Sequence, residues 1–305
     1  MDRLESMSIL LAVVEAGSLS GATRKLRIPL ATVSRKISDL ESGLKARLLN
    51  RSSRQLSLTN AGRDYVAACK RILEFVGEAE RAAAGEYSAP KGDLVIAAPI
   101  VFGRLHVLPI VTEFLKTFPD IDVRMIQSDR LANLLEDHID VAVRIGELPD
   151  SSLVATRLGV IRRVVCASPA YFRMRGTPRS PTDLASHDCI TFENLGTPAA
   201  WKFGTGKLEV SVAIHSRLAV NTAEAATDAA IAGAGITRLL SYQVEGALTA
   251  GKLVLALEEF EPAPWPVSLV HGGQGMLPLK LRAFLDFAAP PLKAGLLHGV
   301  GHGLP

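Results

Sequence analysis

The sequence predicts an α/β multidomain protein, in which a short helical unit and one long helix precede a larger domain of strands and helices. Three observations carry this prediction. Apolar residues recur at helical spacing up to about residue 86. From residue 93 short apolar runs alternate with amphipathic helices. Residues 1–63 hold 11 Lys and Arg against 5 Asp and Glu, whereas the remainder carries a net charge of −3. Such asymmetry is typical of a nucleic-acid-binding module joined to a second domain.

Composition excludes several classes of protein. The chain has 305 residues, 48% of them hydrophobic, which is enough to build more than one core. It has neither a signal-peptide pattern nor an apolar run of bilayer length, so we expect no membrane association. Cys69, Cys166 and Cys189 form no C-x-x-C pair, which favours reduced, buried thiols in the cytoplasm over a redox sensor. We expect neither a metal nor a cofactor.

A helix-turn-helix is predicted near the N-terminus. A first helix with an apolar face ends at Gly17. Ser18 can cap a helix over 19–26, and Pro29 suits the first position of a helix over 30–42. The apolar stripe of this last helix is made of Val33, Ile37, Leu40 and Leu44.

The opposite face of that helix is small, polar and cationic, which suits a DNA major groove. The candidate contacts there are Ala31, Thr32, Ser34, Arg35 and Ser38, with Ser18 at the preceding cap. The alternative is an ordinary amphipathic helix with a solvated face. Residues 48–58 predict a two-stranded wing whose tip carries Arg51 and Arg54, suited to phosphates or a minor groove; the alternative is a solvated basic loop.

A long helix over 61–86 is predicted to dimerise the chain. Its apolar seam alternates at spacings of four and three, and contains Tyr65, Cys69, Ile72, Val76 and Ala79. The alternative is a helix that packs on its own domain. We expect a DNA-binding domain over 1–60 and a hinge over 87–92.

An α/β domain over 93–290 is predicted to form two lobes with a ligand cleft between them. Lobe I would hold 93–163 and 266–290, and lobe II would hold 164–265, with a disordered tail over 291–305. The expected strands are 93–99, 122–127, 141–146, 164–168, 189–192, 201–203, 208–220 and 266–271. The expected helices are 103–118, 131–137, a helix from Pro169, 222–232 and 278–289.

Together these residues resemble the LysR-type transcriptional regulators, over nearly the whole chain. The resemblance rests on MDRLESM, VVEAGSLSGA, TVSRKISDLE, RLLNRSSRQLSLTNAG, FGRLHVLP, DVAVRIGELPDSSLVATRLG, CASPAYF and DLASHDCI. It implies a winged helix-turn-helix, a dimerising linker helix and an effector domain similar to periplasmic solute-binding proteins. It also implies a double-stranded DNA operator, a dimer or tetramer, a small-molecule effector and contact with RNA polymerase.

The same resemblance implies which residues line the effector cleft. They are Pro99, Ile100, Val101, Phe102, Gly103, Ser128, Asp129, Arg144, Ile145, Gly146, Cys166, Asn221 and Thr222. The chain departs from the family at Arg27, where Gly is common in the motif turn, and at Ile100 and Val101, where hydroxyl side chains are common.

Helix starts near Gly103 and Thr222, with Arg144 beside them, favour an effector that carries a carboxylate and an apolar body. The alternative is that Arg144 pairs with Asp129. A different class, a cytoplasmic solute-binding or enzymatic α/β domain with a basic N-terminal module, remains open. A dimerised scaffold for a protein partner is a third possibility. No catalytic motif such as G-x-S-x-G or H-E-x-x-H is present, so we expect no enzyme.

Overall fold

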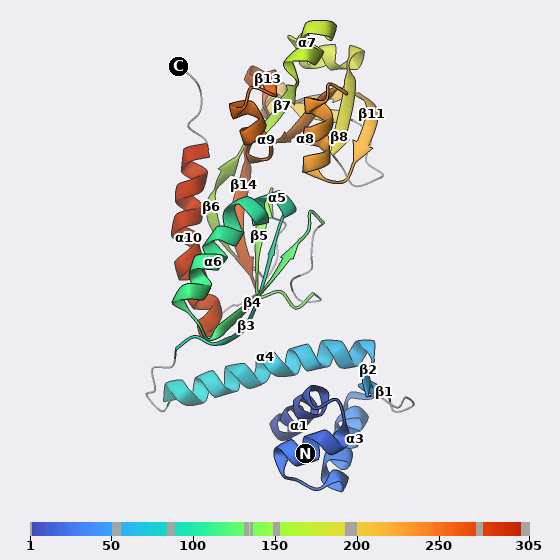
Figure 1. Cartoon of the computed structure of the whole chain (residues 1–305), viewed down its shortest axis with the longest axis vertical. Coiled ribbons are helices and arrows are strands. Elements are labelled where there is room, and N and C mark those ends of the chain that lie inside the picture. Colours follow the sequence, from blue (N-terminus) through green and yellow to red (C-terminus); the bar gives the residue numbers. More distant parts are fainter. Residues whose placement is uncertain are drawn as a thin grey trace. The chain divides into compact units, whose positions relative to one another are not determined.

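The computed structural model (Figure 1) describes residues 2–50, 56–83, 89–130, 134, 137–148, 153–192, 200–272 and 277–299. The chain separates into two compact units, Met1–Pro90 with Leu135–His138, and Lys91–Leu134 with Ile139–Pro305. The first unit contains the predicted winged helix-turn-helix. The second is an α/β domain with two sheets.

The N-terminal unit packs three helices on one core. They are α1 (Arg3–Glu15), α2 (Leu19–Leu26) and α3 (Leu30–Leu44). Residues from all three helices fill the core, among them Leu10, Ala22 and Ile37. Ser18 caps α2 as predicted, because its Oγ accepts a hydrogen bond of 3.0 Å from Gly21 N–H. Leu44 corrects the predicted stripe: its side chain is 38% exposed, so the apolar contact ends at Leu40.

The turn between α2 and α3 is left-handed at a non-glycine residue. Arg27 has φ 56° and ψ 37°, so this turn accommodates an arginine where glycine would be less strained. Pro29 differs from the prediction by one position: it is the cap residue and α3 begins at Leu30. Its extended ψ of 145° directs the chain into the helix without a side-chain cap.

The wing joins α3 to the long helix α4 (Asn60–Ala83). Strands β1 (Leu49–Asn50) and β2 (Ser57–Leu58) pair antiparallel. Glu41 of α3 accepts hydrogen bonds from the N–H groups of Leu48 and Leu49, at 2.8 and 3.1 Å. Thr59 Oγ1 accepts from Gly62 N–H at 2.9 Å, which starts α4. A Cβ on Gly62 would lie 2.0 Å from Leu48 O, so only glycine permits this approach of helix and wing.

Helix α4 buries the first part of the predicted seam in its own unit. Cys69 is 0% exposed and Tyr65 packs against the same core. Assignment of Cys69 to a dimer interface is therefore wrong, because it has no surface to offer a partner. Further along, Ile72 and Phe75 are 41% and 40% exposed, and Ala79 is also exposed.

The first sheet of the α/β domain has the strand order β4-β3-β5-β14-β6. Its members are β3 (Gly92–Ala98), β4 (Ile121–Gln127), β5 (Val141–Ile145), β6 (Val154–Ile161) and β14 (Trp265–His271). Strands β4, β3 and β5 are parallel, as predicted from their alternation with helices, whereas β14 runs antiparallel to both β5 and β6. A continuous helical segment follows β3 and begins three residues earlier than predicted. It is made of α5 (Ile100–Phe102), a π-helical turn (Gly103–Val107) and α6 (Leu108–Thr117).

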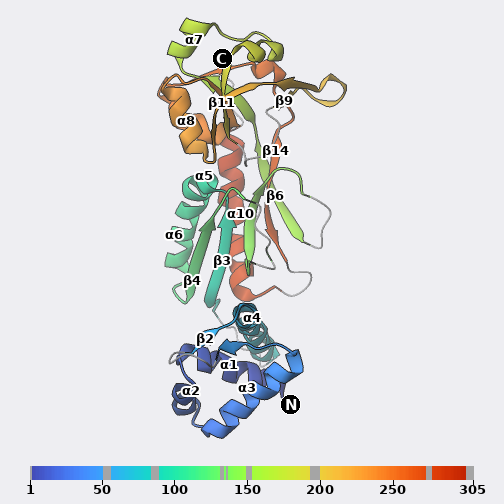
Figure 2. The same cartoon turned by 90° about the vertical axis from the view of Figure 1, so that its right-hand side faces the viewer.

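The second sheet has the order β11-β8-β12-β7-β13, and its edge strand β11 is labelled in Figure 2. Its members are β7 (Arg163–Ala167), β8 (Asp188–Phe192), β11 (His215–Val220), β12 (Ile236–Leu240) and β13 (Val254–Ala256). Helices α7 (Pro169–Arg175), α8 (Ala223–Ile231) and α9 (Ser241–Thr249) belong to this lobe. The predicted strand over 208–220 is divided: β10 (Val210–Ala213) pairs with β9 (Ala200–Phe203) apart from the sheet, and β11 begins after Ile214.

The C-terminal helix corrects the predicted disordered tail as far as Gly299, and residues 300–305 of that tail lie outside the described residues. Helix α10 runs Leu279–Gly299 and continues through Pro290 and Pro291. Leu292 and Leu296 are 3% and 7% exposed, and a Cβ on Gly159 of β6 would lie 2.9 Å from the Leu296 Cβ. Burial of these leucines against the first sheet explains why the helix extends past the two prolines. Most of the helix predicted over 131–137 lies outside the described residues.

Candidate functional site

A pocket of about 240 Å³ lies between the two sheets of the α/β domain. Strands β3, β4 and β5 of the first sheet direct their carboxyl ends toward it, and the ends of β8, β11 and β12 close the other side. Crevices at the carboxyl ends of strands are the usual ligand sites of such sheets. Its walls are formed by Ala97, Ala98, Pro99, Ile126, Ser128, Asp129, Arg130, Ala142, Val143, Arg144, Ile145, Phe192, Asn221, Leu240, Tyr242, Gln243 and Trp265.

The structure places some of the predicted cleft residues on this wall and others away from it. Pro99, Ser128, Asp129, Arg144, Ile145 and Asn221 line the pocket. Ile100, Gly146 and Thr222 are next to lining residues in the chain but are not on the wall, and Gly103 is buried away from it. Gly146 N–H donates to Pro266 O at 2.9 Å, and Thr222 Oγ1 accepts from Ala225 N–H at 3.3 Å. Both groups are therefore used in hydrogen bonds with the protein backbone.

Val101, Phe102 and Cys166 are core residues, which corrects their assignment to the cleft. They are 3%, 0% and 0% exposed and belong to the main core of the domain. Burial raises the pKa of the Cys166 thiol to about 12, so this side chain is neutral and unreactive at neutral pH. Cys189 has the same properties, with a pKa of about 12, and all three cysteines are free and buried.

Several aromatic and polar wall residues were not predicted. Phe192 ends β8, and the rule of strand carboxyl ends could have identified it. Trp265 stands at the return between the sheets, next to the predicted strand. Tyr242 and Gln243 lie on α9, a helix that the sequence did not reveal, so no local signal indicated them.

Asp129 connects the pocket wall to the start of the helical segment that follows β3. Its Oδ1 accepts a hydrogen bond of 3.1 Å from Ile100 N–H. Its Oδ2 is buried and has no hydrogen-bond partner within the described ranges. Burial raises the pKa of this carboxyl, as does the negative charge of Glu224 in the first turn of α8, while the bond from Ile100 lowers it. Asp129 is therefore easier to protonate than an ordinary aspartate.

Tyr242 links the pocket to the packing between the sheets. Its ring meets Phe102 edge-on at 5.4 Å between centroids, and it meets His106 at 5.7 Å. Burial raises the pKa of the Tyr242 hydroxyl, and the charges of Asp129 and Glu224 raise it further. Burial lowers the pKa of His106, so this ring is held in its neutral form. Its Nε2 has no hydrogen-bond partner among the residues that the structure describes.

Two arginines, Arg130 and Arg144, line the same pocket. Burial lowers the pKa of Arg144, but a guanidinium remains charged in proteins. The Arg163 guanidinium does not line the pocket, but it lies 4.4 Å from the ring centroid of the wall residue Trp265 in a cation–π contact. The pocket thus combines two cations, one acid and an apolar, partly aromatic surface.

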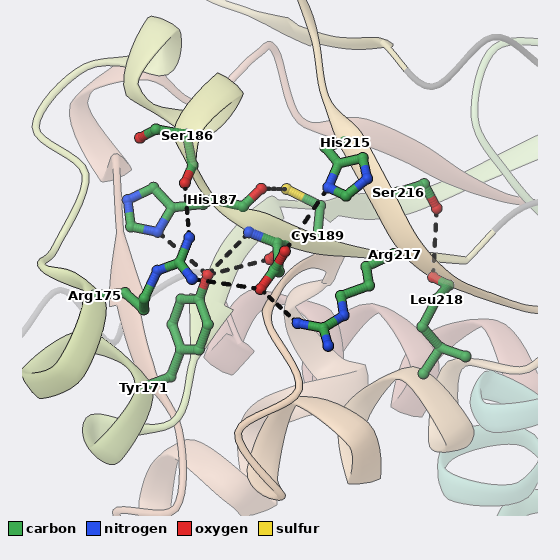
Figure 3. A network of polar contacts seen from close by, with 10 residues as sticks. Tyr171, Arg175, Ser186, His187, Cys189, His215, Ser216, Arg217 and Leu218 are labelled. Atoms are coloured by element: carbon green, nitrogen blue, oxygen red, sulfur yellow. Dashed lines mark hydrogen bonds and ion pairs between the residues drawn. The ribbon is translucent and has the colours of Figure 1, made fainter.

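The second lobe carries a separate polar cluster, in which Arg175, His215 and Arg217 (Figure 3) surround the carboxylate of Asp188. Asp188 Oδ2 lies 2.9 Å from Arg217 Nη1 and 3.7 Å from Arg175 Nη1, and its Oδ1 lies 3.7 Å from His215 Nδ1. The Arg217 hydrogen bond holds the pKa of Asp188 below its usual range. Tyr171 Oη accepts from Asp188 N–H at 3.0 Å. These contacts tie α7, β8 and β11 together, and we assign the cluster a structural role.

The predicted DNA-binding face of α3 is the part of that helix left outside the core. Ala31 and Arg35 are exposed, whereas Thr32, Ser34 and Ser38 are half-buried. Leu30 at the helix start is 50% exposed. Arg51 and Arg54 at the wing tip lie outside the described residues. The α3 surface therefore offers a short, largely small-residue strip with one central guanidinium, which fits the dimensions of a major groove.

Within the described ranges, no group of three or more His, Cys, Asp or Glu is arranged to hold a metal ion. In that same part of the chain, no single helix is long and apolar enough to cross a membrane; only α1 and α2 taken together, bent by 117°, satisfy that length and composition.

Two sequence profiles match the two units. Residues 4–63 match the bacterial regulatory helix-turn-helix protein of the lysR family, and residues 88–290 match the LysR substrate binding domain. A transcriptional repressor of Pseudomonas aeruginosa is 34% identical over 289 residues, covering 94% of this chain and 91% of the repressor. The transcriptional activator AaeR of Escherichia coli is 30% identical over 286 residues, covering 94% of this chain and 93% of AaeR.

A solved structure extends the agreement to the fold. CrgA, a LysR-type transcriptional regulator from Neisseria meningitidis, has a TM-score of 0.60 at 32% identity, covering 94% of this chain and 98% of CrgA. Profiles, relatives and structure agree with the helix-turn-helix and the two-lobed domain described above. The relatives are named as regulators of transcription, which decides against the enzymatic alternative. The chain belongs to the LysR family of DNA-binding transcriptional regulators with an effector-binding domain.

Proposed function

We propose that the pocket between the two sheets is the effector site of this regulator, and that its occupancy controls how the protein contacts its operator. The single observation that carries the proposal is the position of the pocket, whose walls come from both sheets at the carboxyl ends of their strands. A ligand there touches both lobes at once, so it can change the lobe arrangement by binding one arrangement better than another. The site would act in the cytoplasm, beside the DNA.

Effector chemistry is constrained by the charged residues of the wall. A carboxylate remains the expected partner of Arg130 and Arg144, because guanidinium groups bind carboxylates well. The two helix starts invoked from the sequence do not contribute to such binding. Asp129 already bonds Ile100 N–H, and Thr222 already caps α8. An effector carboxylate would therefore face the arginines and not the helix N-termini.

DNA binding is proposed to involve a dimer held by α4, because operator half-sites are read by paired recognition helices. The exposed residues Ile72, Phe75 and Ala79 recur at i, i+3 and i+7 and form one stripe on α4, next to the half-buried Val76. A tetramer built from two such dimers is a further proposal, as is contact with RNA polymerase when the protein activates. The named relatives include a repressor and an activator, so the sign of regulation is left to experiment.

The proposed function is tested by footprinting the full-length protein on its own upstream DNA, with and without a panel of metabolites. We expect at least one metabolite to change the footprint. Asn221→Trp, which places a large side chain on an exposed position of the pocket wall, should abolish that change and keep DNA binding. A metabolite response that persists in Asn221→Trp would mean that the effector binds elsewhere.

A further inference from the structure

Asp129, on the wall of the pocket, has one carboxyl oxygen in use and one without a partner among the described residues. Asp129 follows β4 and reaches the start of α5, where its Oδ1 is used by Ile100 N–H. Its Oδ2 is enclosed and receives no hydrogen bond from the part of the chain that the structure describes. A carboxylate offers about four acceptor positions, and leaving a buried acceptor unused costs free energy. Buried polar groups of this kind require a physical explanation.

Two groups of the opposite lobe interact electrostatically with the same carboxyl. Glu224 in the first turn of α8 and the hydroxyl of Tyr242 on α9 both belong to the second lobe. The charge of Glu224 raises the pKa of Asp129, and the charges of Glu224 and Asp129 raise that of Tyr242. The charge of Glu224 therefore disfavours a second negative group next to Asp129.

We propose that the effector carries a primary amine, bound as its ammonium ion, which donates a hydrogen bond to the carboxyl of Asp129. This inference rests on the proposed function, because it takes the pocket as the effector site. An ammonium group offers three donors and a positive charge, so it satisfies the acceptor and offsets the field of Glu224 together. A hydroxyl would satisfy the acceptor only, and a carboxylate would add to the repulsion.

The rest of the pocket fits a small amphoteric molecule. Phe192 and Trp265 offer aromatic surface for an apolar body. Arg130 and Arg144 offer cationic groups for an acid at the other end. The ligand class is therefore an amine with an apolar or aromatic body, and an amino acid or amino-substituted acid would use all of these contacts.

The test uses matched compounds and the full-length protein. Binding is measured by calorimetry for a panel of primary amines and α-amino acids, each compared with the molecule that lacks the amine. Phenylalanine is paired with 3-phenylpropanoate, and benzylamine with benzyl alcohol. We expect amines to bind about tenfold or more tightly than their partners, as a charge-assisted hydrogen bond implies. Asp129→Asn should reduce this preference to within about twofold.

Asn can still accept from Ile100 N–H, so Asp129→Asn is expected to fold, and an unchanged far-ultraviolet circular dichroism spectrum checks this. The matched control is Asp122→Asn, the same change at an exposed position of β4, which should keep the preference. The inference is overturned if no amine binds, if the amine-free partner binds as tightly, or if Asp129→Asn retains the preference. If the effector that binds has no amine and Asn221→Trp blocks its binding, the inference is overturned but the proposed function stands. If Asn221→Trp leaves effector binding intact, the proposed function itself is overturned.

Discussion

Arg162 and Glu261 join the two chain connections that run between the sheets of the effector domain. Arg162 stands between β6 and β7, where the chain first crosses, and Glu261 precedes β14, where it returns. Arg162 Nε lies 2.8 Å from Glu261 Oε2, and its Nη2 lies 2.7 Å from Oε1, so the pair is bidentate. The Glu261 contact raises the pKa of Arg162. The two connections are thus fixed to one another, and lobe movement must turn both of them together.

Glu261→Gln should destabilise the effector domain by about 1 to 3 kcal/mol, because it removes a bidentate, largely buried charge-assisted contact. Glu258 lies 3.2 Å from Arg162 Nη2 and would retain part of the interaction. The measurement is urea-induced unfolding of the full-length protein, and Glu259→Gln is the control at an exposed neighbouring position. Equal stability of Glu261→Gln and Glu259→Gln would show that the pair does not hold the connections.

Asp129→Asn should stabilise the unliganded protein at neutral pH. The pKa of Asp129 is raised by burial and by Glu224. A raised folded-state pKa contributes stability that is fully present below the ordinary value of about 4 and is lost as pH rises through the folded-state pKa. The advantage of Asp129→Asn should therefore shrink as pH falls toward about 4. Thermal unfolding across this range, with Asp122→Asn as control, measures it. A difference that is independent of pH would contradict the assigned cause.

Sequence patterns predicted the elements whose structure depends on neighbouring residues in the chain. The helix cap at Ser18 and the apolar positions Val33 and Ile37 were predicted correctly, because each depends only on residues a few positions away in the chain. Strand β6 was missed, although residues 154–161 alternate in burial, because its place was set by pairing with β14 more than 100 residues later. The prolines at 290 and 291 predicted an end to the last helix, and burial of Leu292 and Leu296 overrode them.

The sequence predicted only those pocket residues whose position follows from the end of a single strand. Asp129 and Arg144 follow or end strands of the first sheet, so their place on the wall follows from the parallel order of β4, β3 and β5. Tyr242 reaches the pocket from α9. The position of α9 depends on how β12 pairs within the second sheet, and no short sequence pattern encodes this pairing. Cys166 was misplaced because a strand next to the crossing can face the core as easily as the cleft.

Arg35→Ala should weaken specific operator binding by about 1 to 3 kcal/mol and relax sequence preference at one position of each half-site. The reason is its exposed position at the centre of the polar face of α3, where a guanidinium can reach a base edge. A mobility shift against operator and scrambled DNA measures it, and Arg3→Ala on α1 is the control for loss of charge alone. Normal operator affinity in Arg35→Ala would mean that α3 is not the recognition helix.

Arg54→Ala should weaken binding to all DNA sequences alike and reduce the dependence of affinity on salt, as loss of one phosphate contact implies. Its structure lies outside the described residues, so this prediction comes from the sequence alone. The salt slope of binding to operator and to scrambled DNA is the measurement. A loss confined to the operator would instead indicate that the wing tip reads bases.

Ile72→Glu should dissociate the dimer and leave the N-terminal unit folded. Ile72 is 41% exposed on α4 beside Phe75, so a charge at this position is tolerated by the monomer. In a dimer that covers the stripe, the same charge would be buried and unpaired, which destabilises the interface. Sedimentation should show loss of the dimer, with loss of operator affinity because only one half-site is then read at a time. Cys69→Glu supplies the contrast: Cys69 is 0% exposed in the core of its own unit, so this change should unfold that unit. An association state unchanged in Ile72→Glu, at native helical content, would show that the dimer is held elsewhere.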